Sequence, residues 1–353
     1  MHTTAVGTDV AWKAADLAAD TSRWIHELSP AQIADIDAAL AASKAAGAGI
    51  EGLTRETFPL GEALEALELV HRALEEDLGL FVLRGLPVER YTKDELRLVY
   101  WGLGLHLGTA VTQSEKGDVL GDVRNFGDEV SAASQTGRGY MSREWLGFHT
   151  DTSDVVALMV LRTSKSGGRS MFASSVAIRD KIAATWPQLH DILQQPFYWS
   201  WKGQEPEGEL PYYQQPIFTT HEGRFSSRYI KTHIMSAQEL ADVPRLTEWQ
   251  RAAMTAIDLL AMDPEYHYSM QFEPGDMQFL NNHVTYHART AFEDYPEPDR
   301  KRHLLRMWLA TPRTRALAPS MSAIYPDQAA GAVRGGFPSQ AEEFVFETKV
   351  SEL

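Results

Sequence analysis

The hydrophobic pattern of this chain changes its period near residue 110, and this change constrains the fold more than any other feature. Before it, apolar residues recur every three or four positions, as in amphipathic helices. After it, short apolar and aromatic runs alternate with turn residues, as in strands. Helices first, then many strands with an inserted helix, favour an α+β fold built around a mostly antiparallel barrel.

Local signals predict several elements in the first 110 residues. Ser29 followed by Pro30 gives a capped start to a first helix, and leucines at helical spacing from Leu60 onward indicate a second. Thr92 with Glu95 forms a capping box that opens a third. The apolar run 79–85, bounded by glycines, is expected to be a buried strand.

Further elements are expected along the rest of the chain. From 111 to 139 the pattern breaks into Gly-rich pieces, which indicates loops and short strands. The apolar run 155–161, the Gly167-Gly168 turn and residues 170–175 together predict a β-hairpin. Helices are expected over 175–193 and 246–262, a loop over 203–214, and strands over 268–272, 277–280 and 303–310.

Charge and composition exclude several classes of protein. The formal net charge is −15, and no run of five basic residues occurs, which argues against binding to nucleic acids or anionic membranes. The chain has no cysteine, so disulfides and thiolate metal sites are excluded. No apolar segment has the length of a membrane span, and the first residues lack the pattern of a signal peptide. A cytoplasmic protein is expected.

One short motif carries metal chemistry. His149 is the only histidine that is followed two residues later by a carboxylate, Asp151. In an extended strand the two side chains point the same way. One more histidine nearby in space would complete the set of two histidines and one carboxylate that binds non-haem Fe(II) and leaves positions open. Alone, the pair is as consistent with a surface pair or a buried structural histidine.

The third ligand is sought near the end of a late strand, where two histidines compete. His283 and His287 are four residues apart, so a strand through both would place them on one face. The residues alone leave this choice open.

Five motifs, taken together, resemble a known family. They are Phe148-His-Thr-Asp151, Gly167-Gly-Arg-Ser170, Pro274-Gly-Asp276, Asn281-Asn282 with His287-Ala-Arg-Thr-Ala-Phe292, and Arg302-His-Leu-Leu-Arg306-Met-Trp308. The chain is similar to the iron(II)- and 2-oxoglutarate-dependent dioxygenases of the taurine dioxygenase (TauD/TfdA) type, which are related to clavaminate synthase.

The resemblance implies a double-stranded β-helix (jelly-roll) core with flanking helices. It also implies one domain over 1–353, with a mostly helical part to 110, the core over 111–310 and a tail over 311–353. The tail is expected to pack over the barrel or a neighbouring subunit. Relatives are often dimers or tetramers, so a homo-oligomer is compatible with the resemblance. No coiled-coil pattern in this chain specifies an interface.

The same resemblance assigns roles to residues. His149, Asp151 and His287 are the implied Fe(II) ligands. Arg302 is the implied partner of the 2-oxoglutarate carboxylate, with Ser170 in support, and Arg306 is turned toward cosubstrate or substrate. A guanidinium binds a carboxylate through two parallel hydrogen bonds, which suits this task. No functional role is assigned to Arg289.

The implied reaction uses O2 and 2-oxoglutarate, releases succinate and CO2, and hydroxylates an unactivated C–H bond of a small organic substrate. Related halogenases lack the carboxylate, so Asp151 favours hydroxylation, desaturation or oxidative cleavage. Gln113, Asn125 and Arg228 are expected at the mouth of the barrel, with the aromatic residues Trp145, Tyr198, Trp199 and Trp201 as walls and the loop 203–214 as a lid. For each of these, a packing role is at least as consistent with the sequence.

The identity of the substrate is left open. A pocket that contains Arg306 or Arg228 would favour a carboxylate- or sulfonate-bearing molecule such as an amino acid, whereas the aromatic residues suit a more apolar one. Two other functions are compatible with the same residues. One is a mononuclear non-haem iron oxygenase that does not use 2-oxoglutarate, and the other is a non-catalytic jelly-roll binding protein.

Overall fold

A computed structural model describes residues 11–125, 142–339, 341 and 343–347. Its larger sheet has the strand order β1-β2-β14-β6-β17-β3, and β4 also pairs with β17. These strands are β1 (Ile25–Glu27), β2 (Leu80–Arg84), β3 (Thr109–Val111), β4 (Gly121–Val123), β6 (Val155–Arg162), β14 (Met277–Asn281) and β17 (His303–Ala310). β1 and β2 are parallel, and the other pairs are antiparallel.

A smaller antiparallel sheet has the order β13-β8-β15-β5. Its strands are β13 (His267–Met270), β8 (Ser170–Ser174), β15 (Thr285–Arg289) and β5 (Leu146–His149). Three two-stranded ribbons complete the β structure: β9 (Pro196–Ser200) with β10 (Tyr212–Pro216), β11 (Phe218–His221) with β12 (Arg224–Ser227), and β7 (Ser166–Gly167) with β16 (Phe292–Glu293).

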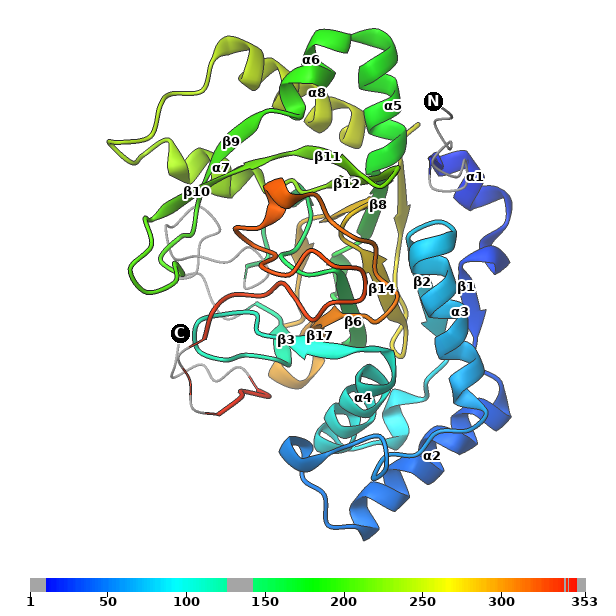
Figure 1. Ribbon diagram of the computed structural model, residues 1–353. Helices are drawn as coiled ribbons and strands as arrows, with labels where there is room; N and C mark the ends of the chain where they lie inside the picture. Colours follow the sequence, from blue (N-terminus) through cyan, green and yellow to red (C-terminus); the bar gives the residue numbers. More distant parts are fainter. Residues whose placement is uncertain (1–10, 126–141, 340, 342, 348–353) are drawn as a thin grey trace.

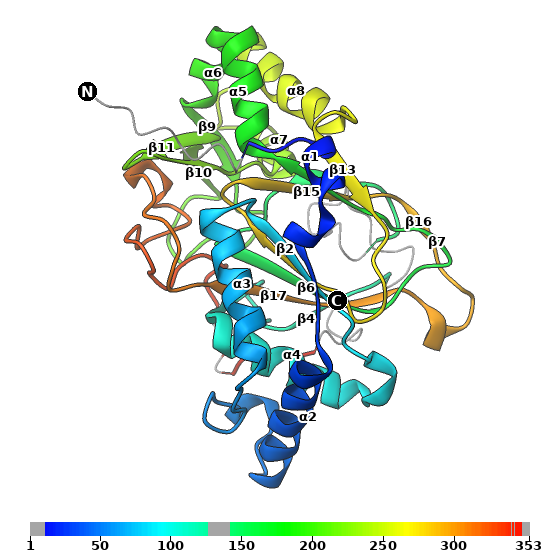
Figure 2. The same ribbon diagram turned by 90° about the vertical axis from the view of Figure 1, so that its right-hand side faces the viewer.

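The α-helices gather in two groups at opposite ends of the molecule (Figures 1 and 2). α2 (Pro30–Ala45), α3 (Ala63–Glu76) and α4 (Lys93–Leu107) form one group. α5 (Ser175–Thr185), α6 (Pro187–Leu193) and α8 (Glu248–Met262) form the other, while α1 (Ala14–Ala19) and α7 (Lys231–Ala237) are shorter.

The central strands of the larger sheet are buried on both faces. Along β6, Val156 and Val160 belong to the core shared with the smaller sheet, whereas Ala157 and Met159 belong to the core under α2, α3 and α4. β2 and β17 alternate in the same way. The layers are therefore helices, a large sheet and a facing small sheet, which is the predicted jelly-roll core with flanking helices.

The helix starts follow the capping signals. Ser29 caps α2 and Thr92 caps α4, as predicted, and both caps are capping boxes, of which only the one at Thr92 was predicted as such. The helix expected over 175–193 is interrupted, since α5 ends before Trp186 and α6 begins at Pro187. A residue before proline is pushed out of the helical region, and Trp186 has φ −138° and ψ 69°.

The predicted β-hairpin after Asp151 is wrong. β6 pairs with β14 and β17 in the larger sheet, whereas β8 pairs with β13 and β15 in the smaller one. The Gly167-Gly168 turn therefore crosses from one sheet to the other. A continuous apolar run indicates that a strand is buried on both faces, but it does not identify the neighbours of that strand.

The segment after β17 packs on the barrel of its own chain. Arg334 Nε donates to Asp154 Oδ1 at 2.9 Å, and Arg315 contacts Glu75 at 2.8 Å. The Gly336 N–H donates to the Thr152 carbonyl at 2.6 Å, one residue after Asp151. Within the described ranges, no helix has the length and apolar character needed to cross a membrane.

The turn Pro274-Gly275-Asp276 connects the smaller sheet to the larger one. Asp276 is fully buried and accepts from Arg84 Nε and Nη2 at 2.8 and 2.7 Å. Gly275 has φ +90°, and a Cβ there would lie 2.1 Å from the Leu86 carbonyl oxygen. The turn therefore requires glycine at this position.

Gly275→Ala is expected to lower the thermal midpoint more than Gly203→Ala. Both glycines have positive φ, 90° and 76°, so both variants carry a backbone strain of about 1–2 kcal/mol. A Cβ at Gly203 meets nothing within 4 Å, so only the Gly275 variant adds a clash. Circular dichroism during heating measures the difference, and equal midpoints would contradict the role given to the turn.

Candidate active site

Two histidines that lie far apart in the chain meet across neighbouring strands of the smaller sheet. β5 ends at His149, which is the register partner of His287 at the centre of β15. Their ring centroids are 4.2 Å apart, and the ring planes are inclined by 47°. Side chains directly opposite each other on antiparallel strands share one face of the sheet, so both imidazoles point into the same space.

Asp151 lies in the loop after β5, and Asn282 fixes that loop. Asn282 Oδ1 accepts from the Asp151 N–H at 2.9 Å, and its Nδ2 donates to Ser153 Oγ at 3.1 Å. Asp151 Oδ2 is 3.7 Å from His287 Nε2. One ligand atom from each of His149, Asp151 and His287 lies within 4.8 Å of the other two. Within the described residues, no other group of histidines and carboxylates meets this condition.

The hydrogen bond of His149 and the pKa values of His287 and Asp151 suit a metal ion. His149 Nδ1 lies 2.8 Å from the Gly147 carbonyl, which only accepts, so Nδ1 carries a proton and Nε2 is the nitrogen that can face a metal ion. Burial, with His149 and Arg306 nearby, lowers the pKa of His287 to about 3 despite Asp151. Burial raises the pKa of Asp151, but Arg306 and the two histidines outweigh it and lower that pKa. Two neutral imidazoles and one carboxylate form the donor set of non-haem Fe(II) sites.

His283 does not belong to the group formed by His149, Asp151 and His287. It sits in the turn before β15, and its Nε2 is 2.7 Å from Asp154 Oδ1. The assumption that His283 and His287 share a strand is wrong, because β15 begins only at Thr285. Of the two candidates, the fold brings only His287 to the pair His149 and Asp151.

Arg302 immediately precedes β17 and is buried. Burial and the nearby Arg289 lower its pKa to about 9, although Asp294 opposes them. Among the described residues, Arg302 Nη1 has no hydrogen-bond partner. A guanidinium in this state is destabilised until an anion compensates its charge.

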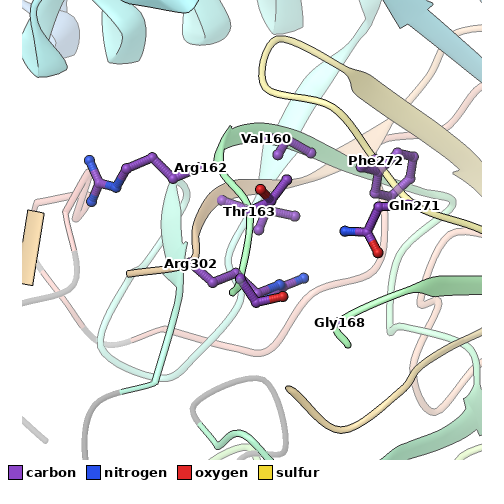
Figure 3. A pocket seen from close by; sticks show the side chains of 9 residues that line it. Val160, Arg162, Thr163, Gly168, Gln271, Phe272 and Arg302 are labelled. Atoms are coloured by element: carbon purple, nitrogen blue, oxygen red, sulfur yellow. The ribbon is translucent and has the colours of Figure 1, made fainter. Parts of the chain in front are cut away.

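A small pocket, partly open to solvent, lies beside Arg302. Arg302 and Gln271 extend toward its interior, whereas Arg162 points away from it (Figure 3). Phe272 and Leu304 supply apolar lining. The cavity therefore places one buried cation and an amide beside apolar side chains, the kinds of group that the carboxylate end of a small anion contacts.

Ser170 and Arg289 lie near this region on adjoining strands. Ser170 opens β8, is buried, and is the register partner of Arg289 on β15. The guanidinium carbons of Arg289 and Arg302 lie 4.8 and 5.2 Å from the ring centre of Phe292. The strands therefore bring Ser170 and Arg302 into one neighbourhood.

Arg306 and Gln113 form a single unit. Arg306 Nε donates to Gln113 Oε1 at 2.6 Å, and Gln113 Nε2 donates to the carbonyls of Val119 and Arg306 at 3.1 and 2.9 Å. Gln113 is buried, so its amide orients Arg306. The charge of Arg306 reaches Asp151, whose pKa it lowers against the effect of burial.

Arg228, expected at the mouth of the barrel, is buried, with only 1% of it exposed. Its guanidinium carbon lies 4.7 Å from the ring centre of Trp199 and 5.6 Å from that of Tyr213. Its Nη2 donates to Thr152 Oγ1 at 3.2 Å. The aromatic residues around it come from the β9–β10 ribbon.

The other residues expected at the mouth are dispersed. Asn125 is half-buried just beyond β4, and Trp145 is exposed. Trp199 and Trp201 are buried against Tyr213, whereas Tyr198 contacts Tyr212. The last three residues of the expected loop 203–214 belong to strand β10.

Sequence reasoning missed Trp308, Tyr213 and Gln215. The indole N–H of Trp308 lies near the Asp151 carboxylate and favours its charged form without making a hydrogen bond to it. Its position two residues after Arg306 on a strand was an available signal. Nothing in the sequence indicated that Tyr213 and Gln215 are buried beside a charge.

His283 is expected to make stability depend on pH. Burial lowers its pKa below 6.5 although Asp154 raises it, so the unfolded chain binds the proton more readily. Stability is then lost as pH falls from about 6.5, by up to about 1.4 kcal/mol per pH unit. Denaturant unfolding of wild type and His283→Gln at pH 7.5 and 5.5 measures this. An equal pH dependence in both proteins would contradict it.

Comparison with known proteins gives matches over most of the chain. The family model described as "Taurine catabolism dioxygenase TauD, TfdA family" matches residues 43–308. FR-33289 synthase of Streptomyces rubellomurinus is 34% identical over 305 residues, which cover 86% of this chain and 90% of that protein. Taurine hydroxylase-like protein SAT17 of Stachybotrys chartarum is 29% identical over 288 residues, 79% of this chain and 73% of the relative.

Two solved structures share the fold. One is asparagine oxygenase in complex with Fe(II), (2S,3S)-3-hydroxyasparagine and succinate, with a TM-score of 0.62 and 19% identity over 88% of this chain and all of that one. The other is the non-heme iron oxygenase OrfP with Fe and alpha-ketoglutaric acid, with a TM-score of 0.59 and 17% identity over 81% of this chain and 93% of that one.

Proposed function

Because this chain belongs to the TauD/TfdA family of dioxygenases, we propose that His149, Asp151 and His287 bind its Fe(II) and that it hydroxylates a small organic acid. The enzyme class follows from the family: it is an Fe(II)- and 2-oxoglutarate-dependent dioxygenase. The observation that carries the assignment of the ligands is the convergence of three ligand atoms within 4.8 Å, from two strands and a loop.

The metal and cosubstrate supply the oxidation, and the protein orients the groups. When bound, Fe(II), 2-oxoglutarate and O2 provide the chemistry that places one oxygen atom in a C–H bond and yields succinate and CO2. His149 and His287 supply neutral nitrogen donors, and Asp151 supplies one negative charge. Asn282 fixes the Asp151 backbone, which keeps the carboxylate on the side of the imidazoles.

Arg302 is proposed to bind the distal carboxylate of 2-oxoglutarate, with Ser170 in support. The support is the buried guanidinium, its partnerless Nη1 and the adjacent cavity. A carboxylate there would restore the pKa of Arg302, which burial and Arg289 lower to about 9. Arg306, oriented by Gln113, is assigned to the carboxylates of cosubstrate or substrate nearer the metal.

The substrate is proposed to carry an acidic group, as amino acids do. Two solved relatives were captured with hydroxylated amino acids, 3-hydroxyasparagine and (3S)-hydroxy-L-Arg. The buried arginines Arg306 and Arg228 fit a molecule of that charge. With Asp151 present as a ligand, the outcome proposed is hydroxylation rather than halogenation.

The metal assignment is tested by anaerobic addition of Fe(II) and then 2-oxoglutarate. The chelated cosubstrate is expected to give a weak visible charge-transfer band in wild type and in His283→Gln. His287→Gln is expected to give none, because one of three ligands is gone. Circular dichroism verifies the fold of each variant. A band in His287→Gln, or its loss in a folded His283→Gln, would falsify the assignment.

Arg302→Gln is expected to raise the KM for 2-oxoglutarate by roughly 30-fold or more, because losing a buried charged contact costs about 2 kcal/mol or more. Arg162→Gln is the matched control, since Arg162 lines the same cavity but points away from it (Figure 3). Succinate release is the measurement. Oxidation without succinate, unchanged in Arg302→Gln, would instead favour an oxygenase that does not use an oxo acid.

A further inference from the structure

Arg228 is a buried cation for which the described residues provide no anion. Only 1% of it is exposed, and Thr152 Oγ1 accepts from its Nη2. Its Nε and Nη1 have no hydrogen-bond partner, and no carboxylate in the described ranges lies within ion-pair distance. The flat faces of Trp199 and Tyr213 contact the guanidinium but cannot neutralise it.

Three other buried arginines of this chain have carboxylate partners. Arg97 pairs with Asp122, Arg315 with Glu75, and Arg334 with Asp154. Burial of an unpaired charge costs several kcal/mol, so a fold that pairs these arginines gains nothing in stability from leaving Arg228 unpaired. This contrast indicates a ligand rather than a structural role.

Two further polar side chains beside Arg228 also lack partners. Tyr213 and Gln215 occupy alternate positions of β10, so they project from the same face. Both are buried, and neither the Tyr213 hydroxyl nor the two amide atoms of Gln215 make a hydrogen bond within the described residues. Burial raises the pKa of Tyr213 although Arg228 lowers it, so the phenol keeps its proton and remains a donor.

This group lies close to the proposed metal ligands. The Thr150 N–H donates to the Tyr229 carbonyl at 2.9 Å, and the Tyr229 N–H donates to Thr150 Oγ1 at 3.2 Å. The segment with Arg228 therefore runs beside the segment with His149 and Asp151. Thr152, which contacts the Arg228 guanidinium, follows Asp151 directly in the chain. The side chains of Arg228 and Asp151 are therefore separated by a distance on the order of 10 Å.

We propose that Arg228, Tyr213 and Gln215 form a subsite for the acidic group of the substrate. Its ligand is an oxyanion, either a planar carboxylate or a tetrahedral sulfonate, on an aliphatic chain of a few carbons that extends toward the metal. The proposal rests on the proposed function and deepens it, because it places the acidic group of the substrate away from the 2-oxoglutarate cavity at Arg302.

The first test is the stability of the enzyme without substrate. Arg228→Met removes the charge at similar volume, and the thermal midpoint is expected to stay level or rise. Arg334→Met is the matched control, because it leaves Asp154 buried without its guanidinium partner and is expected to lower the midpoint by several degrees. A fall in Arg228→Met as large as that in Arg334→Met would show that Arg228 is structural and would overturn the proposal.

The second test measures binding to the anaerobic enzyme loaded with Fe(II) and 2-oxoglutarate. The probes are 4-aminobutanoate, 3-aminopropanesulfonate and 4-aminobutanamide, which keeps the ammonium group but has an uncharged amide in place of the acidic group. The readout is perturbation of the charge-transfer band. Wild type is expected to prefer one anionic probe over the amide by roughly tenfold or more. Arg228→Gln is expected to lose that preference, and Arg228→Lys to regain part of it. The favoured probe distinguishes carboxylate from sulfonate.

The controls separate this proposal from the proposed function. The band formed before any probe is added must be the same in wild type and Arg228→Gln, because Arg228 is not assigned to metal or cosubstrate. Loss of the band in wild type would contradict the proposed function itself. An intact band with the same response of wild type and Arg228→Gln to every probe would contradict the subsite alone.

Discussion

The pairing of β5 with β15 is the interaction on which the candidate site depends. It places His149 opposite His287 and thereby converts two distant segments into one face of a metal site. β15 also pairs with β8, so the same strand carries Arg289 beside Ser170 at its other end. The centre of β15 therefore carries one proposed metal ligand, and its end lies beside Ser170, in the neighbourhood of the proposed cosubstrate anchor.

Local structure was largely predictable from the sequence, whereas strand partners were not. The capping residues Ser29 and Thr92 act within one turn of helix, so their signal is complete in the sequence. The neighbours of β6 depend on strands more than a hundred residues away, and its apolar run gives no sign of them. The predicted hairpin failed for this reason. The choice between His283 and His287 needed the start of β15, which the residues alone did not show.

Buried charge divides this molecule into two kinds of region. Where arginine meets carboxylate, as in Arg84 with Asp276, the pair joins segments that are distant in the chain and gives the scaffold one arrangement. Where a buried guanidinium has nitrogens without hydrogen-bond partners among the described residues, as in Arg302 and Arg228, the folded protein contains a buried positive charge that is not compensated. The sequence alone does not distinguish these two kinds of arginine, because the difference is whether a carboxylate lies beside the guanidinium in the folded protein.

The contact between Gly336 and Thr152 gives the segment after β17 a part in the order of folding during synthesis. Once β17 has left the ribosome, the nascent chain already contains all three proposed ligands. The carbonyl of Thr152, next to Asp151, then still lacks its hydrogen-bond donor, the N–H of Gly336. Asp154 likewise has no ion-pair contact with Arg334 until Arg334 has been synthesised. The loop that carries Asp151 therefore reaches its final form only after residues 334–336 have been synthesised, and a chain truncated between β17 and Arg334 would hold the proposed ligands in an incomplete loop.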